Sequence, residues 1–515
     1  MRKVLYVPLD DRDCNYQFPW LLSQMTEGLE LLRPPYEWMG FLKKPANREK
    51  IWEWLFEQAG ECDYAILSVD TLVYGNIIGS RIHTYSMEEC RETMDRFRQL
   101  KKQNPQLHIH AFNLAARVAA YNDNHEDPEY WQEYGYDIWR YTWLWDKKKR
   151  AEISEKEAEE LESLQKKIPE EIMQDFLERR KTDRFVNLTS VELVRENVFD
   201  ILTVPKDDTA EFGYAALDQM AIMQKAEGEQ LMDRVYCYPG ADEVGSVIFA
   251  RVFCQIKQYQ PVFYVRYSSL TGSSVIPLYE DRPLGESIKW QILSAGGICS
   301  ETPADADCML AVNAPGTCQI ESANQKNGRN FASDNATNPE ELLRYIRYYK
   351  EYYGKPVGIS DVTMANGCDN GFMNRAMQHH TFDRIAALGG WNTVENTNGV
   401  VIAVLAIAAF YQDWTDFPEL KKKADTFLLR ALTADWLCQA NVLRQFLDEY
   451  APTHQIEPYF LREKEESREY FLRCLRSLMQ EKLGGRLKGQ KAILENIRFN
   501  WNGAFYYAVD VSLKE

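Results

Sequence analysis

The sequence lacks most of the short motifs that would identify a function at once. It contains no GxxxxGK[ST] phosphate loop, no GxGxxG dinucleotide fingerprint, no GxSxG nucleophile elbow and no HExxH zinc motif. Their absence argues against the common NTPases, dinucleotide-dependent enzymes and elbow hydrolases. The pairs His108/His110 and His379/His380 lack the spacing and the partner acids of a zinc site. We therefore expect no metal site built on histidine.

The chain also lacks CxxC pairs, an export signal and a membrane-length apolar run. Its 11 cysteines are scattered and odd in number, a pattern typical of free thiols in a reducing compartment. The N-terminal MRKVLYVPLDDRD has neither a signal-peptide core nor a small-residue cleavage site. The longest apolar run, 400–411, is shorter than the roughly 20 residues that span a bilayer. We expect a cytoplasmic protein without a membrane partner.

Basic residues are in deficit, with 60 Lys and Arg against 77 Asp and Glu and a net charge of −17. Such a charge repels phosphate backbones and anionic lipids, which argues against nucleic acid and membrane surfaces as partners. Apolar residues make up 45% of the 515 residues and aromatic residues 13%, enough for a sizeable core. We expect a small-molecule or glycan substrate as the partner, and the oligomeric state stays open.

Short apolar runs alternate with segments of helical periodicity, which predicts an α/β fold with parallel strands. Helical spacing is present in segments such as 51–58, 88–101, 214–225 and 287–293. The eight strand-like runs cover residues 4–12, 64–76, 107–118, 201–208, 235–245, 262–269, 309–316 and 357–369.

Eight runs favour closure into a (β/α)8-like barrel, although a ninth strand-like segment at 28–40 suits an open doubly wound sheet. We expect an α/β catalytic core of residues 1–127 and 196–412, and no internal repeat is evident. A charged helical insertion occupies 128–195. A helical region with a terminal strand pair near 497–511 fills 413–515.

Acidic and amide side chains follow most of the predicted strands. Because parallel strands direct their carboxyl ends the same way, we expect these side chains to meet in one cleft. Clustered carboxylates persist where a metal, a shared proton or a cation compensates them, although each also has a plain interpretation as a helix cap. The candidates are Asp10, Asp11, Arg12, Asn15, Asp70, Tyr74, Asn76, Arg81, Asp207, Asp208, Asp242, Glu243, Asn313, Asp361, Asn366, Asp369, Trp391, Asn392 and Asn396.

Six segments together resemble a bacterial family labelled domain of unknown function 4127. They read VPLDDRDCN, ILSVDTLVYGNIIGSR, PKDDTAEFG, YPGADEVG, ISDVTMANGCDNG and GGWNTVENTNG. The sequence departs from the family pattern at Asp13, Asn76 and Lys206, where we expect Pro, Gly and Gln. The resemblance implies a bacterial α/β protein, but it does not imply any particular activity.

The favoured hypothesis is a glycoside hydrolase without a cofactor, because glycosidases need one protonated and one ionised carboxyl group. The adjacent pair Asp207–Asp208 suits an N-acetylhexosaminide, with Asp207 orienting the acetamido group and Asp208 as the acid. Asp242 or Glu243 is the alternative second carboxyl. Burial among like charges should raise the pKa of Asp208 or Glu243, because we expect the group with the raised pKa to lie farthest from Arg12 and Arg81.

Two further hypotheses stay open beside the glycoside hydrolase. The first is a Mg²⁺- or Mn²⁺-dependent hydrolase of a phosphorylated or acidic small molecule, with Arg12 and Arg81 as anion clamps. Its metal ligands would be Asp10, Asp11, Asp70, Asp208, Asp242 and Asp361. The second is a non-catalytic sugar-binding protein, which would use the same aromatic and amide side chains without chemistry.

Overall fold

The computed structural model describes residues 1–327, 335–461 and 464–515. The chain forms two compact units. The first consists of Met1–Asp11, Gly28–Gly245 and Tyr279–Asp281, and the second of Arg12–Glu27, Ser246–Leu278 and Arg282–Glu515. This division cuts across the single α/β core that we expected over 1–127 and 196–412.

A six-stranded parallel sheet in the order β2-β1-β3-β4-β5-β6 forms the centre of the first unit. The strand order reverses between β1 and β3, the point at which open α/β sheets form their ligand crevice. Nearly all its strand residues are buried, in agreement with the continuous apolar runs of the sequence. The strands are β1 (Arg2–Val7), β2 (Leu29–Leu32), β3 (Tyr64–Ser68), β4 (His108–Phe112), β5 (Ile201–Lys206) and β6 (Val235–Pro239).

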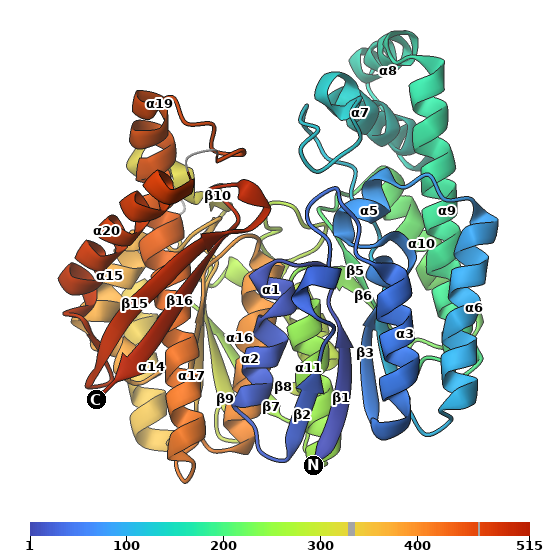
Figure 1. The fold of residues 1–515 in the computed structure, drawn as a ribbon. Coiled ribbons are helices and arrows are strands. Elements are labelled where there is room, and N and C mark those ends of the chain that lie inside the picture. The colour runs from blue at the N-terminus through green and yellow to red at the C-terminus, as the bar shows by residue number, and fades with distance from the viewer. Residues whose placement is uncertain (328–334, 462–463) are drawn as a thin grey trace. The chain divides into compact units, whose positions relative to one another are not determined.

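The helices of the first unit follow the strands, and three of them form the predicted helical insertion. Figure 1 shows α7 and α8 beyond the carboxyl ends of the strands, with α9 running back along the sheet. The helices are α3 (Arg48–Gln58), α4 (Val69–Tyr74), α5 (Ile77–Ile82), α6 (Met87–Gln103), α7 (Trp131–Arg150), α8 (Glu155–Lys167), α9 (Glu170–Arg195) and α10 (Tyr214–Gly228). Helix α11 (Val244–Lys257) begins at the end of this unit.

Local capping after β3 explains how polar side chains reach the end of the sheet. The Ser68 hydroxyl accepts a hydrogen bond from the Thr71 amide at 3.1 Å and starts α4. Gly75 ends this helix at φ +104°, where a side chain would also meet Pro45. The Thr71 hydroxyl donates to the carbonyls of Pro8 and Leu9 at 2.7 and 2.8 Å, which ties the ends of β1 and β3 together.

A five-stranded parallel sheet in the order β13-β11-β9-β7-β8 forms the centre of the second unit. In chain order, its second strand lies beside the first at one edge and the later strands follow on the other side, as in the first unit. Both units therefore have the order known from flavodoxin-like doubly wound folds. The strands are β7 (Val262–Tyr267), β8 (Ile298–Ser300), β9 (Cys308–Asn313), β11 (Val357–Asp361) and β13 (Ala387–Gly389).

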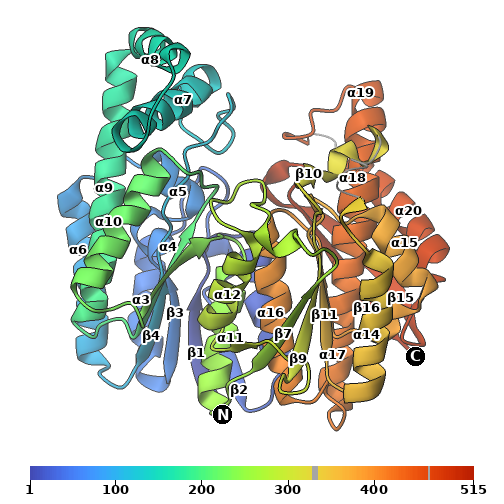
Figure 2. The same ribbon diagram turned by 180° about the vertical axis from the view of Figure 1, so that it is seen from behind.

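Helices flank the second sheet, and α16 packs on β9, β11 and β13 (Figure 2). Gly358 and Gly389 allow this close approach, since a Cβ at either position would lie within 3.0 Å of Val401. The helices are α1 (Asp13–Tyr16), α2 (Phe18–Gln24), α12 (Leu284–Ser294), α14 (Pro339–Tyr353), α15 (Asn370–Gln378), α16 (Val394–Phe410), α17 (Pro418–Ala431), the π-helix η6 (Leu432–Val442), α18 (Leu443–Gln445), the π-helix η7 (Phe446–Tyr450), α19 (Ala451–His454) and α20 (Lys464–Leu483).

Two small sheets complete the second unit. Strands β10 (Ile320–Glu321) and β12 (Met364–Ala365) pair in parallel, and β14 (Arg486–Leu487), β15 (Gln490–Phe499) and β16 (Tyr507–Lys514) form an antiparallel sheet. Asp13 connects this sheet to the helices through ion pairs with Arg430 at 2.6 Å and Arg498 at 3.0 Å. The terminal strand pair that the sequence indicates is confirmed.

The favoured barrel prediction is wrong. In the described parts of the chain, the strands form two open parallel sheets and no closed barrel. The α/β class, the eight strand-like runs and the extra strand at 28–40 are confirmed. No disulfide joins the cysteines of the described residues, in agreement with the expected thiols. Among the described residues, no helix has both the length and the apolar character needed to cross a membrane.

Candidate active site

Two buried arginines hold the Asp207–Asp208 pair at the carboxyl end of β5. Arg81, on α5, forms ion pairs with Asp207 at 2.6 Å and with Glu126 at 2.7 Å. Arg117, which follows β4, pairs with Asp208 at 3.1 Å and also contacts Glu126. The Arg81 and Arg117 side chains are 4% and 9% exposed, so these ion pairs lie in a medium of low dielectric constant.

Each of the two aspartates uses one carboxyl oxygen in its hydrogen bond with an arginine. The Oδ2 atoms of Asp207 and Asp208 accept the arginine hydrogen bonds. Their Oδ1 atoms accept no hydrogen bond from any described residue. The Asp208 side chain is 30% exposed and the Asp207 side chain 10%, so Asp208 is the member that solvent or a substrate reaches.

Asp208 has both a raised pKa and a strained backbone. Burial, followed by repulsion from Asp207, raises the pKa of Asp208 to about 6, although Arg117 and Arg81 oppose the shift. We expected the raised group to be remote from the arginines, and this expectation is wrong. Its φ of +34° is unusual for a residue other than glycine, and such strain is concentrated at functional sites.

A fully buried lysine lies directly before this pair. The Lys206 ammonium group forms an ion pair with Asp281 and donates to Gln219 Oε1 at 2.8 Å. Both partners belong to the same unit, so this buried charge is compensated where the strand ends. Lys206 thereby fixes the end of β5, which positions Asp207 and Asp208.

The remaining acidic candidates of the first unit are buried close to their own strand ends. Asp10 and Asp11 follow β1, and Asp11 accepts a hydrogen bond from the Tyr36 hydroxyl at 3.4 Å. Asp242 and Glu243 follow β6, and Glu243 accepts from the Ala241 amide at 3.0 Å. Their roles in substrate binding or catalysis stay predictions.

Asp70 lies completely buried at the strand-order reversal between β1 and β3. Its Oδ2 accepts hydrogen bonds from the Leu114 amide at 2.9 Å and from Asn113 at 3.3 Å, whereas its Oδ1 has no hydrogen-bond partner among the described residues. Burial raises the pKa of Asp70 to about 7, and the two hydrogen bonds limit the rise. This carboxyl group is therefore largely protonated below neutral pH.

We predict that Asp70→Asn weakens the pH dependence of stability. The folded protein keeps the Asp70 proton up to about pH 7, whereas an unfolded aspartate loses it near about pH 4. The folded state binds more protons in this window, so the stability of the wild type falls as pH rises. Between about pH 5 and pH 8 the wild type should lose about 3 kcal/mol more than the variant. Urea unfolding of both proteins at the two pH values measures the difference, and parallel changes would contradict it.

Asn76 and Tyr74 have structural roles beside their predicted roles in binding. Asn76 Oδ1 accepts from the Gly79 amide at 2.7 Å and caps α5, while its Nδ2 donates to the Leu42 carbonyl at 2.8 Å. Tyr74 is buried, and its ring stacks on His83 with 4.5 Å between the centroids. Helix α5 carries Arg81, so this cap supports the ion pair with Asp207.

We predict that Asn76→Ala lowers the free energy of unfolding by about 2 kcal/mol. The change removes a helix cap and leaves the buried Gly79 amide without its acceptor. Chemical denaturation measures the effect. Asn47→Ala is the matched control, because this residue caps α3 by a 3.2 Å bond near the surface and should cost less than Asn76→Ala. Equal losses of unfolding free energy in Asn76→Ala and Asn47→Ala would show that burial of the cap does not add to its contribution.

The second unit brings three of the predicted residues together at the ends of β9 and β11. Asn313 Nδ2 donates to Asp361 Oδ1 at 2.8 Å, and the Asp369 amide donates to Asp361 Oδ2 at 2.8 Å. Burial, followed by repulsion from Asp369, raises the pKa of Asp361 well above its usual range. Asp369 also caps α15 through the Gly371 amide at 2.7 Å, so its structural interpretation is confirmed.

The loop before α16 is held by a carboxyl group that the sequence analysis missed. The Gly390 amide donates to Asp435 at 3.1 Å, and burial raises the pKa of Asp435 to about 8. Asn392 adopts φ +49° and its carbonyl accepts from the Asn366 amide at 2.7 Å. Trp391 contacts Phe18 edge to face at 6.0 Å.

The other candidates of the second unit occupy their own local environments. Arg12 stacks over Trp501 at 4.4 Å, and Asn366 Nδ2 donates to Glu321 at 2.9 Å. Asn15 on α1 and Asn396 on α16 are buried. The predicted meeting of all candidates in one cleft stays a prediction, since they are divided between the two units.

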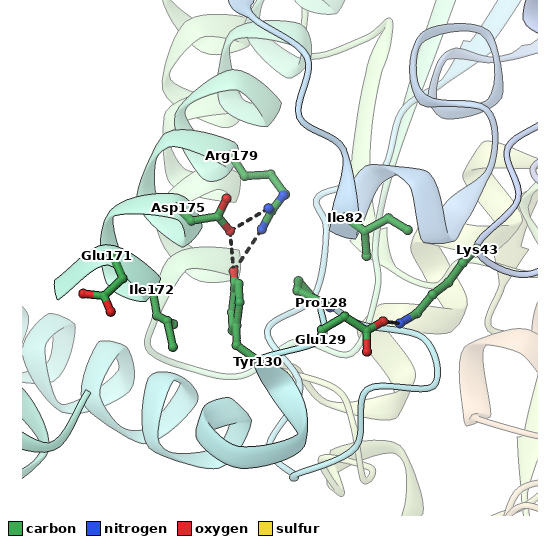
Figure 3. A pocket seen from close by; sticks show the side chains of 9 residues that line it. All are labelled: Lys43, Ile82, Pro128, Glu129, Tyr130, Glu171, Ile172, Asp175 and Arg179. Carbon is green, nitrogen blue, oxygen red and sulfur yellow. Dashed lines mark hydrogen bonds and ion pairs between the residues drawn. The ribbon is translucent and has the colours of Figure 1, made fainter. Parts of the chain in front are cut away.

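The helical insertion forms a cavity of about 450 Å³ with the loops of the first unit (Figure 3). On its wall, the Tyr130 hydroxyl donates to Asp175 at 2.8 Å, and Arg179 contacts both groups. Lys43 and Glu129, which also line the cavity, form an ion pair with each other. These charged groups compensate one another, so the cavity wall carries no clear preference for a charged ligand.

Sequence reasoning missed Arg117, Glu126 and Asp127 as neighbours of the candidate pair. The available signal was the polar stretch that follows the β4 run, where Arg117 also pairs with Asp127 at 2.9 Å. The alternative Mg²⁺ or Mn²⁺ hypothesis needs a cluster of acidic ligands. Within residues 1–327, 335–461 and 464–515, no group of three or more His, Cys, Asp or Glu side chains is placed to hold a metal ion.

A family model described as "Protein of unknown function (DUF4127)" matches residues 4–510. The chain belongs to the DUF4127 family. The match covers both units, which agrees with the spread of the resembling segments from β1 to α16. No curated protein matches the chain.

Solved structures give only weak likenesses to this DUF4127 chain. The carboxyl transferase domain of Rhizobium etli pyruvate carboxylase with 3-bromopyruvate is 10% identical over 93% of this chain and 61% of that one, with a TM-score of 0.20. The same domain with pyruvate is 10% identical over 88% of this chain and 54% of that one, with a TM-score of 0.19. A variant of Os79 from O. sativa in complex with UDP is 9% identical over 88% of this chain and 100% of that one, with a TM-score of 0.18. This chain thus spans less than two thirds of the two carboxyl transferase structures, and scores this low support neither a fold nor an activity.

Proposed function

We propose that this DUF4127 protein is a cytoplasmic glycoside hydrolase acting on a small glycan or glycoside. The observation that carries the proposal is the pair Asp207–Asp208 in two different environments. Asp207 forms a buried ion pair with Arg81 at 2.6 Å, whereas Asp208 is more exposed and its pKa is raised to about 6. Two carboxyl groups whose environments separate their protonation states are the usual arrangement for acid catalysis.

The pair fits hydrolysis of an N-acetylhexosaminide with help from the substrate. The free Oδ1 of Asp207 accepts the acetamido N–H, which directs the acetamido carbonyl oxygen at C1. That oxygen bonds to C1 while the glycosidic C1–O bond breaks, and Asp208 gives its proton to the leaving oxygen. Water then adds to C1 and displaces the acetamido oxygen, and its proton returns to Asp208.

The proposed roles also explain the surrounding arginines. Arg81 fixes the direction of Asp207, and Arg117 fixes that of Asp208 through one oxygen each. Both side chains are nearly inaccessible to solvent, so they position the pair and do not need to contact the sugar. Arg81 and Arg117 are therefore positioning residues.

A screen of aryl glycosides that includes N-acetylhexosaminides tests the proposal, with the wild type and Asp208→Asn compared for each sugar. Turnover by the wild type that is lost in the variant supports it. Equal turnover in both proteins, or none with any sugar, overturns it. A glycan that binds but stays intact after long incubation would instead indicate the non-catalytic sugar-binding protein.

A further inference from the structure

A cavity of about 520 Å³ in the second unit is lined by uncharged polar and apolar side chains. It lies between the start of α15, the π-helices η6 and η7, and α20. Its volume is in the usual range for small-molecule sites. Arg444 and Glu449 are its charged lining residues, and they balance each other. The rest of the wall combines amides and hydroxyls with apolar side chains, which suits an uncharged ligand that has both hydrogen-bonding groups and an apolar face.

Asn370 and Asn441 are held in fixed orientations on the cavity wall. Asn370 Oδ1 accepts from Trp436 Nε1 at 2.9 Å and from Asn441 Nδ2 at 3.1 Å. Asn441 Nδ2 also donates to the Trp436 carbonyl at 2.8 Å. The indole N–H can only donate and the carbonyl can only accept, so these partners determine which end of each amide is oxygen and which is nitrogen.

The fixed amides leave one donor and one acceptor for a ligand. Asn441 uses both N–H bonds of its amide, so its Oδ1 is the group that remains. Asn370 uses its oxygen, so its NH2 group remains. Neither remaining group has a partner among the described residues, and both residues line the cavity. An acetamido group, or two neighbouring hydroxyls, presents the complementary acceptor and donor.

The backbone under this pair is unusual. Asn441 lies in the π-helix η6, and its side chain caps the carbonyl of Trp436, five residues earlier. π-Helical segments are rare and are frequently found at functional sites. The backbone N–H of Asn370 donates to Gln325 Oε1 at 3.0 Å, which fixes this residue further. The amide pair is therefore rigid before a ligand arrives, which reduces the entropy cost of binding.

We propose that this cavity binds a neutral sugar, with its acetamido group or two neighbouring hydroxyls hydrogen-bonded to Asn370 Nδ2 and Asn441 Oδ1. The cavity belongs to the second unit, whereas Asp207 and Asp208 belong to the first. It does not depend on the chemistry proposed for that pair. Binding here positions or holds a sugar without breaking a bond.

Alkylation of Cys474 by iodoacetamide provides the readout, because this half-buried thiol lines the cavity. The rate at Cys474 is followed by mass spectrometry of its peptide, with exposed Cys318 as the internal reference. N-acetylglucosamine and glucose are the probes. We expect at least one of them to slow alkylation of Cys474 in a saturable way and to leave Cys318 unchanged. The stronger of the two identifies whether the acetamido group or the hydroxyls are recognised.

Asn370→Asp removes the free donor and keeps the local structure. A carboxylate still accepts from Trp436 Nε1 and Asn441 Nδ2, so folding is preserved while the NH2 group is lost. The protecting sugar should then bind about tenfold or more weakly. Asn324→Asp, at an exposed position outside the lining, adds the same charge and should change nothing.

The outcomes separate this site from the proposed hydrolase. No slowing of Cys474 by either sugar, or equal protection in wild type and Asn370→Asp, overturns the sugar site. Because the readout requires no turnover, the result is obtained whether or not Asp208 is catalytic. Repeating the measurement in Asp208→Asn should give the wild-type protection.

Discussion

Asp208→Asn should lower kcat/KM for a glycoside with a poor leaving group by about 10³-fold. The amide keeps the size of the carboxyl group and can still accept the 3.1 Å hydrogen bond from Arg117, but it cannot deliver a proton. For an aryl glycoside whose phenol leaves readily without protonation, the loss should be much smaller. Steady-state kinetics with a series of aryl leaving groups measures this dependence.

The matched control for this substitution is Asp127→Asn. Asp127 also contacts Arg117, at 2.9 Å, yet it is not a proposed proton donor. Its loss should change kcat/KM by the same modest factor for every leaving group. If Asp208→Asn and Asp127→Asn show the same dependence on the leaving group, Asp208 is not the acid.

Arg81→Met should lower the free energy of unfolding by about 3 to 5 kcal/mol. The change leaves Asp207, whose side chain is 10% exposed, without its ion pair, whereas Glu126 keeps its contact with Arg117 at 3.3 Å. A buried charge without a partner keeps its desolvation cost after the compensating attraction is gone. Chemical denaturation monitored by tryptophan fluorescence measures the loss.

A surface ion pair supplies the comparison for Arg81. Arg98 contacts both oxygens of Glu196, at 2.7 and 2.9 Å, but the two side chains are about one third exposed. Arg98→Met should therefore cost less than about 1 kcal/mol. If Arg81→Met and Arg98→Met lower the free energy of unfolding by similar amounts, burial does not increase the contribution of the Arg81 ion pairs to stability.

The sequence predicts the strands well because most of them are buried on both faces. Runs such as 201–208 and 309–316 are continuous and apolar, and each contains a strand of the structure. Strands β8 and β13 escape prediction because each has three residues and shows no periodicity. The order of the strands depends on contacts between distant segments, so eight runs alone could not distinguish one barrel from two open sheets.

The sequence predicts the carboxylates of the candidate site but not most of the side chains that contact them. Asp207 and Arg81 are both recognisable from strand-end chemistry, and the structure joins them although they lie 126 residues apart. Arg117 is hidden in the run 107–118, of which only His108–Phe112 is strand. Asp435 lies within a π-helix, far in the sequence from any strand end, and no pattern in the sequence marks it.

The pH dependence of kcat/KM for an N-acetylhexosaminide with a poor leaving group tests the central claim most directly. Asp208 acts as an acid only while protonated, and its pKa of about 6 places the loss of this form just above pH 6. We expect kcat/KM of the wild type to fall tenfold per pH unit on the alkaline side of this value, and the residual activity of Asp208→Asn to lack this fall. A profile that stays flat from about pH 5 to pH 8, or the same fall in both proteins, would contradict the assignment of Asp208 as the acid.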